Sequence, residues 1–337
     1  YIFEYFKGTD IKVIEDNAGD KTGGNTGNLI IEIPGTIPGK ILLSAHIDTV
    51  VPGKNIVPII DDEKITSSGD TILGADDKAG VAIILETIKQ IKEENLETKN
   101  LLIIFSVSEE TGLLGAKNVD ESIKADYAYI LDSSSKPGTI IVQAPVHYTY
   151  HCKIKGKSSH AGIAPEKGIN AIKIAGEVIS KLPTGRIDEE TTANIGLISG
   201  GSATNIVPEE TEIKGEIRSY NKEKAEKILK ETENIFITVT ENNFGTWDFS
   251  YQKEYDNFKI SENDEVVTLA KKAIEKASLI PITEAAGGGS DGNIYNQRGI
   301  PSVILGMGYE NIHTKNEFMR KDDLYKVMEI ILNIVKG

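Results

Sequence analysis

The sequence has too little cysteine, basic charge and continuous apolar sequence for several classes of protein. Cys152 is the only cysteine among 337 residues, so no intrachain disulfide and no cysteine-based zinc site can form. Lys and Arg total 37 against 51 Asp and Glu, and a net charge of −14 lacks the basic footprint that nucleic acid or an anionic membrane surface requires. No apolar run approaches the roughly 20 residues of a membrane span. The length indicates about two domains, and a lone cysteine fits a reducing, cytoplasmic location.

Short apolar runs alternate with helical patterns over most of the chain. Apolar spacing predicts helices at 81–93 and 322–335. Strands are predicted at 28–33, 40–45, 101–107, 127–131 and 300–305. This alternation indicates an α/β fold with a mostly parallel sheet and helices on both faces.

The middle of the chain has a different pattern, with strands predicted in succession. Helices are expected at 167–181 and 221–240. Strands are expected at 146–155, 191–199, 211–219 and 247–252. We therefore predict an α/β domain built from residues 1–145 and 257–337, interrupted at 146–256 by an α+β domain with a four-stranded sheet and two helices.

Acidic and imidazole side chains gather where the predicted strands end. They are His46 and Asp48 after 40–45, Glu109 and Glu110 after 101–107, Asp132 after 127–131, and His313 beyond 300–305; Asp76 and Asp77 precede the helix at 81–93. In open α/β sheets the ligand site lies outside the carboxyl ends of the strands. We therefore expect these residues to meet.

Two imidazoles and several carboxylates, without a thiolate, suit zinc, cobalt or manganese. The five candidate ligands are His46, Asp76, Glu110, Asp132 and His313. Five ligands fill two three-ligand sites if one carboxylate bridges, and two adjacent ions can activate a shared water for hydrolysis. Of two neighbouring carboxylates such as Glu109 and Glu110, one can bind metal while the other acts as a base. Asp48 is on the same side of an extended segment as His46, so it can orient the imidazole.

Each of these residues also has an ordinary explanation when taken alone. Asp76 and Asp77 could cap a helix, the Glu109–Glu110 pair could be solvated, and His313 could lie in a surface loop. His160, in the turn Ser-Ser-His-Ala-Gly, could be a loop histidine or a donor to a developing oxyanion. The whole set is more specific than any member.

The segment Gly-Gly-Ser-Asp-Gly at 288–292 matches the nucleophile elbow of serine hydrolases. An elbow needs a strand directly before the serine, however, whereas residues 284–289 are small and rich in glycine, and only His313 follows Ser290 to complete a triad. A glycine-rich loop before a short helix more readily offers backbone N–H groups to a substrate, which makes Gly289 a candidate substrate-binding residue.

The chain resembles the dizinc amidohydrolase and peptidase family that contains peptidase T, bacterial glutamate carboxypeptidases, aminoacylases and desuccinylases. The matching motifs cover nearly the whole chain, and Ala-Asp-Asp-Lys-Ala-Gly is most similar to the peptidase T branch. The motifs are Ser-Ala-His-Ile-Asp-Thr-Val at 44–50, Gly-Ala-Asp-Asp-Lys-Ala-Gly at 74–80, Ser-Glu-Glu-Thr-Gly at 108–112, Leu-Asp at 131–132, Ser-His-Ala-Gly at 159–162 and Gly-Ser-Asp-Gly-Asn at 289–293.

The resemblance implies a role for each matched residue. One zinc ion would be held by His46, Asp76 and Asp132, and the other by Asp76, Glu110 and His313. Glu109 would be the general base and acid, Asp48 would orient His46, and the peptide bond between Asp76 and Asp77 would be cis. The inserted domain would be a lid and dimerisation domain, from which His160 donates to the oxyanion while Asn205 and Arg218 bind substrate.

We therefore predict a zinc-dependent exopeptidase that hydrolyses short peptides, a peptidase T-like tripeptide aminopeptidase. Two alternatives remain open: a deacylase or carboxypeptidase of the same family, and a catalytically silent metal-binding interaction protein. The expected partners are a short peptide and, through the inserted domain, a second copy of the chain; neither nucleic acid nor membrane is expected.

Overall fold

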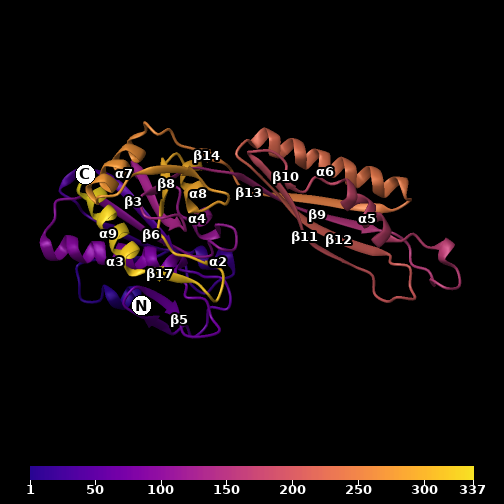
Figure 1. Ribbon diagram of the computed structural model, residues 1–337, viewed down its shortest axis with the longest axis horizontal. Coiled ribbons are helices and arrows are strands. Elements are labelled where there is room, and N and C mark those ends of the chain that lie inside the picture. Colours follow the sequence, from indigo (N-terminus) through magenta and orange to yellow (C-terminus); the bar gives the residue numbers. More distant parts are fainter. The chain divides into compact units, whose positions relative to one another are not determined.

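A computed structural model describes all 337 residues, and the chain forms two compact units. Unit 1 contains both ends of the chain, Tyr1–Ala144 and Phe258–Gly337, and unit 2 is the middle, Pro145–Asn257. Figure 1 labels many of the elements of each unit and colours the chain from its N-terminus to its C-terminus.

Unit 1 is built on a nine-stranded mixed sheet whose centre is parallel. The central neighbours, all parallel, are β6 (Lys99–Ser106), β3 (Ile37–His46), β7 (Tyr127–Ser133) and β16 (Ser302–Gly306). The margins are β1 (Val13–Glu15) and β2 (Leu29–Ile33) on one side, and β8 (Thr139–Ala144), β14 (Phe258–Lys259) and β15 (Ile282–Ala285) on the other. The predicted α/β class with a mostly parallel central sheet is confirmed.

Helices cover both faces of this sheet, as expected. The continuous apolar run in β6 is buried on both sides, since each residue from Leu101 to Phe105 is at most 1% exposed. Leu101, Ile103 and Phe105 pack in one cluster with α3 (Ala75–Glu94), α7 (Glu265–Lys276) and α9 (Lys321–Lys336). On the opposite face lies α8 (Asp291–Gln297), where the Tyr295 and Ser44 hydroxyls are 3.3 Å apart.

The remaining elements of unit 1 are short. Three helices are α1 (Ile2–Tyr5), α2 (Ala18–Thr22) and α4 (Leu114–Asn118). A separate antiparallel sheet is formed by β17 (Phe318–Arg320), β5 (Lys64–Ser67) and β4 (Pro58–Ile60).

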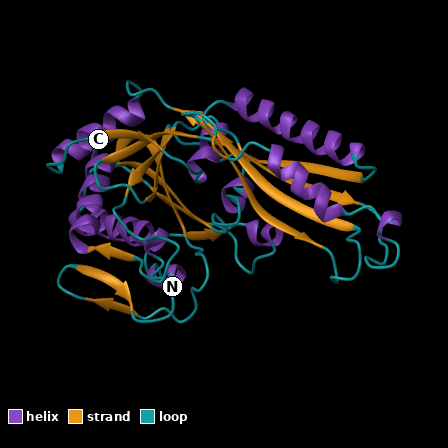
Figure 2. Cartoon of the chain, turned by 45° about the vertical axis from the view of Figure 1, so that its right-hand side comes forward, coloured by secondary structure: helices purple, strands orange, loops and turns teal.

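Unit 2 is an antiparallel sheet with two helices packed on one face (Figure 2). Its strand order is β10 (Gly185–Arg186), β11 (Thr191–Gly200), β12 (Glu210–Ser219), β9 (Val146–Lys155) and β13 (Thr246–Tyr255). The helices are α5 (Ala171–Lys181) and α6 (Lys222–Asn242), with a 3₁₀ turn, η1, at Pro165–Lys167. Their apolar residues share a cluster with Tyr148, Tyr150 and Cys152 of β9.

The prediction of four strands for this sheet was wrong, because the structure has five. The additional strand, β10, has two residues paired with Ala193 and Thr192 of β11. A two-residue strand is too short to give an alternating pattern, so the sequence carried no signal for it. None of the helices in either unit combines the length and apolar composition needed to cross a membrane.

We predict that Ile41→Ala in β3 will destabilise unit 1 by about 2–5 kcal/mol, because it leaves a cavity in a close-packed core. Ile41 is 0% exposed at the centre of the parallel sheet. Urea unfolding followed by circular dichroism measures the effect. Ile60→Ala is the matched control on β4, since Ile60 is 66% exposed, and it should change stability little. Equal losses for the two variants would contradict the prediction.

Candidate active site

The carboxyl ends of the central strands bring the five candidate ligands together in unit 1. His46 is the last residue of β3, Asp132 lies near the end of β7, and Glu110 follows β6. Asp76 is at the start of α3, and His313 is in the loop between β16 and β17. Two triads result, His46–Asp76–Asp132 and Asp76–Glu110–His313, each with its potential ligand atoms within 4.8 Å of one another.

Asp76 belongs to both triads and presents a different oxygen to each. Its Oδ1 lies 3.2 Å from His46 Nε2, and its Oδ2 lies 3.2 Å from His313 Nε2. His46 Nε2 is also 3.9 Å from Asp132 Oδ1, and His313 Nε2 is 2.9 Å from Glu110 Oε1. A carboxylate with one oxygen toward each of two groups has the geometry of a bridging ligand.

Glu109 lies beside these ligands. Together with His46 and Glu110 it forms a third group of potential ligand atoms within 4.8 Å. Its carboxylate takes part in none of the hydrogen bonds or ion pairs of the structure, so its oxygens are free to accept a proton. Its position therefore suits either a base or an additional ligand.

Asp48 contacts both the imidazole of His46 and the loop that carries the two glutamates. His46 Nδ1 lies 3.0 Å from the Asp48 carbonyl oxygen and 3.5 Å from its Oδ1. The Asp48 carboxylate accepts hydrogen bonds from the backbone N–H groups of Glu109 and Glu110, at 3.0 and 3.2 Å. The strand alternation predicted the first contact; the second was not predicted.

The side chains around the two triads include more acidic than basic groups, so negative charge is in excess. Burial raises the pKa of Glu109 well above its usual value, and the charges of Asp132, Asp291 and Glu110 raise it further. Burial likewise raises the pKa of Asp132 well above its usual value, with Asp76 and Asp291 adding to the effect. Buried acids that repel one another in this way favour a site that is completed by cations.

The same carboxylates also change the pKa of the His46 imidazole. Burial lowers its pKa, but hydrogen bonds with Asp48 and Asp76 and the charges of Asp132 and Asp77 outweigh burial and raise the pKa well above its usual value. A strong preference for positive charge at this imidazole is another sign that the surrounding carboxylates lack cationic partners. Nitrogen and oxygen donors in two triads fit a pair of divalent ions such as zinc.

The peptide bond between Asp76 and Asp77 is cis, which confirms the expectation from the resemblance. Asp77 points away from the ligand set and into the protein: its Oδ2 accepts the backbone N–H of His46 and its Oδ1 that of Gly80, both at 3.2 Å. The two adjacent aspartates therefore differ in role, because Asp76 faces the imidazoles and Asp77 faces the backbone.

The glycine-rich segment does not form a nucleophile elbow. The Ser290 side chain caps α8 by accepting the Gly292 N–H at 3.2 Å in a capping box with Asn293, and Ser290 is 5% exposed. Asp291 is hydrogen-bonded to Ser106, and burial raises its pKa to about 6. Gly289 lies in the loop before this helix, half-buried.

Sequence reasoning missed Asn28 and Glu317, two buried residues that hold the loops of the site. Asn28 Oδ1 accepts the Val107 N–H at 3.0 Å, next to the segment that carries Glu109. Asn28 Nδ2 donates to Asp16 at 2.8 Å and to the Gly115 carbonyl at 3.0 Å. Glu317 accepts three backbone N–H groups at 73–76. Neither has a local signal, since Asn28 merely begins a strand and Glu317 follows a polar turn.

The three remaining predicted residues, His160, Asn205 and Arg218, belong to unit 2. The exposed segments of His160 and Asn205 are neighbours, because Ala161 N donates to the Asn205 carbonyl at 2.9 Å. Arg218 on β12 already has a carboxylate partner in Glu216, with Nε to Oε1 at 3.2 Å and Nη2 to Oε2 at 3.1 Å. Its Nη1 donates to the Tyr255 hydroxyl at 3.3 Å.

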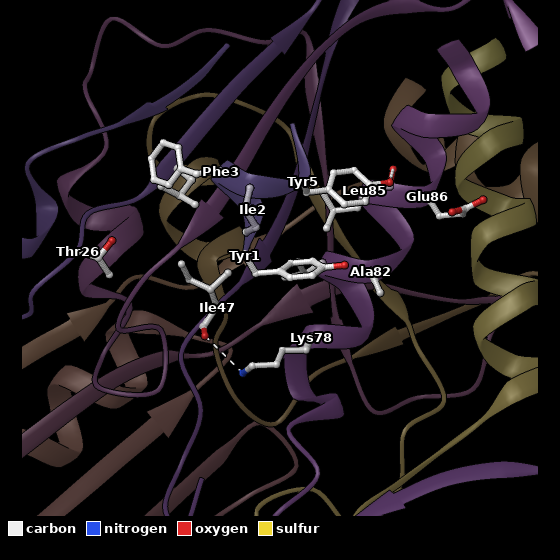
Figure 3. Close-up of a pocket in the computed structure, with 12 residues that line it drawn as sticks. Tyr1, Ile2, Phe3, Tyr5, Thr26, Ile47, Lys78, Ala82, Leu85 and Glu86 are labelled. Carbon is white, nitrogen blue, oxygen red and sulfur yellow. Dashed lines mark hydrogen bonds between the residues drawn. The ribbon is translucent and has the colours of Figure 1, made fainter. Parts of the chain in front are cut away.

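A further cavity of unit 1, of about 620 Å³, lies along α1 and α3 and contains none of the predicted site residues (Figure 3). Aromatic and aliphatic side chains line most of it, among them Tyr1, Phe3 and Tyr5. At one side of it the Lys78 ammonium donates to the Ile47 carbonyl at 3.5 Å.

The profile of peptidase family M20/M25/M40 matches residues 42–337. The chain belongs to this family. It is 46% identical over 331 residues to the protein YqjE of Bacillus subtilis (strain 168), covering 98% of this chain and 89% of that protein. Membership of this family confirms the predicted class, a metallo-exopeptidase that hydrolyses peptide bonds. Peptidases of the M20 family bind divalent metal ions.

Two solved structures are similar over almost the whole chain. Aminopeptidase PepT from Bacillus cereus ATCC 10987 is 43% identical with a TM-score of 0.91, covering 99% of this chain and 91% of that one. A tripeptidase from Staphylococcus aureus subsp. aureus Mu50 is 41% identical with a TM-score of 0.95, covering 99% and 90%. The expected likeness to the peptidase T branch is confirmed.

We predict that Glu216 stabilises unit 2 against acid. A hydrogen bond with His147, helped by Arg218 and opposed by burial, lowers the Glu216 pKa from 4.5 to about 2. A depressed pKa means stability that is present above pH 4.5 and lost as the pH falls toward about 2. Glu216→Gln should therefore lower stability near neutral pH and flatten the loss over this window. The effect is small, because the side chain is 35% exposed and solvent screens it.

Trp247, the only tryptophan and a residue of β13, makes unfolding of unit 2 visible by fluorescence. Urea midpoints measured with this probe from pH 6 to pH 2 test the prediction. Glu189→Gln is the control, because the Glu189 side chain is exposed and makes no ion pair. Curves of the same shape for the Glu216 and Glu189 variants would show that the Glu216 cluster does not contribute.

Proposed function

We propose that this chain is a peptidase T-like aminopeptidase that removes the N-terminal residue of tripeptides with the help of two divalent metal ions. The proposed ligands are His46, Asp76 and Asp132 for one ion, and Asp76, Glu110 and His313 for the other. The observation that carries the proposal is that Asp76 faces two imidazoles with different oxygens, each at 3.2 Å. Zinc is the proposed metal, since its preferred ligands are of this type; cobalt and manganese would accept the same donors.

Two ions bound in this way would lower the pKa of a shared water and polarise the scissile carbonyl. Glu109 would take the proton of that water and return it to the leaving amine. A carboxylate beside the ligands that makes no hydrogen bond of its own can both accept this proton and donate it again. Asp48 holds the backbone of Glu109 in place through its N–H group.

Unit 2 would contribute substrate recognition. We propose that His160 donates a hydrogen bond to the oxyanion, that Asn205 and Arg218 bind the peptide, and that Gly289 of unit 1 offers its backbone N–H. In support, His160 and Asn205 are exposed and lie on neighbouring segments. Arginine suits a carboxylate such as the peptide C-terminus because its planar guanidinium can donate two parallel hydrogen bonds. In the structure Arg218 makes such a pair with Glu216, so binding the peptide would require it to exchange this partner.

A homodimer through unit 2 is part of the proposal. Beyond the short β10, the edge of β11 carries Leu197 and Ile198, which are 65% and 54% exposed. An unpaired strand edge with apolar side chains is suited to pairing with a second copy.

The names of the similar structures favour an aminopeptidase for tripeptides over the two alternatives. A deacylase or carboxypeptidase of the family would use the same metal ligands but would accept a blocked N-terminus. A silent metal-binding protein would have no use for Glu109, whose carboxylate makes no hydrogen bond or ion pair that would stabilise the fold.

We predict that zinc- or cobalt-loaded protein will release the N-terminal residue from free tripeptides, but not from the same tripeptides after N-acetylation. Product identification by mass spectrometry over matched free and acetylated pairs separates the possibilities. Chelation should abolish release, and added zinc should restore it. Faster cleavage of the acetylated peptide would favour the deacylase, C-terminal release would favour the carboxypeptidase, and no cleavage with both ions bound would favour the silent protein.

We predict that Glu109→Gln will lower kcat by about 10²–10⁴-fold, since a proton-transferring side chain contributes about that much. Metal analysis should still find two ions per chain, because the five ligands are intact. Glu121→Gln, an exposed acid of the same unit, is the control and should keep normal activity. A kcat within a few-fold of the unsubstituted protein would remove Glu109 from its proposed role.

A further inference from the structure

Glu317 is a buried carboxylate whose hydrogen bonds all go to the backbone of the segment that carries Asp76. It is 1% exposed. Its Oε2 accepts the N–H groups of Leu73 and Gly74 at 2.8 and 2.7 Å, and its Oε1 accepts the N–H of Asp76 at 3.0 Å. These three donors come from a segment more than 240 residues earlier in the chain.

This carboxylate supplies what the start of α3 lacks. Gly74 is the N-cap residue, with a φ of +74°, and it has no side chain to accept the free N–H groups of the first turn. Unpaired N–H groups at a helix start are costly when buried, and the helix dipole favours a negative charge there. Glu317 accepts one of these first-turn N–H groups, that of Asp76, together with the N–H groups of the two residues before the turn, and it places a carboxylate at this end of the helix.

The segment that Glu317 holds carries the one ligand common to both triads. Asp76 has non-helical backbone angles, φ −82° and ψ 100°, so ordinary helical hydrogen bonding does not fix its orientation. Its two carboxylate oxygens nevertheless lie at equal distances from His46 and His313. The hydrogen bond from Asp76 N to Glu317 is a direct restraint on this residue.

Glu317 also lies in the loop that carries His313, another ligand of the second triad. It follows His313 by four residues, and its own N–H donates to the Thr314 carbonyl at 3.2 Å. His313 itself has a left-handed backbone, φ +62°, and is 47% exposed, so few contacts of its own side chain hold it. One carboxylate thus joins the loop of His313 to the loop of Asp76.

We propose that Glu317 is a positioning residue that sets the metal affinity of the Asp76–Glu110–His313 triad. It acts through the backbone and touches neither the ions nor the peptide. Residues that orient metal ligands change metal affinity by about 10–100-fold when they are replaced. The His46–Asp76–Asp132 triad depends on Glu317 less, because His46 ends a buried strand and is separately held by Asp48 and Asp77.

The inference rests on the proposed two-metal site, and the test measures metal binding without any substrate. Metal-free Glu317→Gln and unsubstituted protein are titrated with Co²⁺ by calorimetry and visible absorption. The glutamine keeps the size of the side chain but turns an amide NH₂ toward backbone donors. We expect one of two binding steps to weaken by about 10–100-fold while the other changes less than threefold. Glu63→Gln, an exposed glutamate of unit 1, is the matched control and should leave both steps unchanged.

Two results would overturn the inference in different ways. If Glu317→Gln binds both ions as the unsubstituted protein does, Glu317 has no positioning role, whatever the activity of the enzyme. If the unsubstituted protein never binds a second ion, the two-metal function and this inference both fail. Should Glu317→Gln not fold, as judged by circular dichroism, Glu317→Asp is titrated instead. Its shorter carboxylate cannot reach all three N–H groups, and unchanged affinity in both steps would contradict the proposal.

Discussion

Repulsion among buried carboxylates is the constraint on which the rest of unit 1 depends. Eight acidic side chains converge near the ends of the central strands, against the two imidazoles and Lys78. They are Asp48, Asp76, Asp77, Glu109, Glu110, Asp132, Asp291 and Glu317. Ionised groups taken out of water are strongly unfavourable unless they are paired or hydrogen-bonded. The fold must therefore supply a partner for each acid, and the kind of partner separates these residues into two groups.

In one group the carboxylate is satisfied by backbone N–H groups. Asp48, Asp77 and Glu317 each accept at least two of them, and each thereby fixes a loop that carries a proposed ligand or the base. In the other group the oxygens meet imidazoles or hydroxyl groups, or make no hydrogen bond. Asp76 meets the two histidines, and Glu110 meets His313. Asp132 meets His46 and the Tyr309 hydroxyl, Asp291 meets the Ser106 hydroxyl, and Glu109 makes no hydrogen bond. Only the second group has oxygens left for cations. The structure thus distinguishes carboxylates that hold the site together from those available for chemistry.

This division also explains how much of the site could be predicted from sequence. A residue at the end of a parallel strand is placed by the strand, so His46, Glu110 and Asp132 could be located from local patterns alone, and Asp76 from the start of a helix. Glu317 and Asn28 could not, because their function lies in contacts with backbone groups far away in the chain, at separations of 241–244 and 79–87 residues. The two-residue strand β10 was missed for a different reason, since it forms only where β11 offers an edge. The central parallel sheet and the helices on both faces followed from repeating apolar patterns, which a single chain displays without any tertiary information.

The order of the segments has a consequence for how the site is assembled. Both His313 and Glu317 come from the last part of the chain, after unit 2 has interrupted unit 1, whereas Asp76, which they contact or hold, comes from the first part. Until the later segment docks, Asp76 lacks one of its two imidazoles and the start of α3 lacks its acceptor. The ends of this long connection are brought together at an entropic cost that grows only slowly with its length, so a compact inserted unit is tolerated. Ions that bind only the completed triads would stabilise the state in which the last part of the chain is packed against the first part. Their binding free energy would add to the free energy of that packing, because a ligand specific for the native state stabilises it. Metal binding and closure of unit 1 would then be one coupled equilibrium, in which Glu317 belongs to the closing segment and acts on the proposed ligand at the other end of the connection.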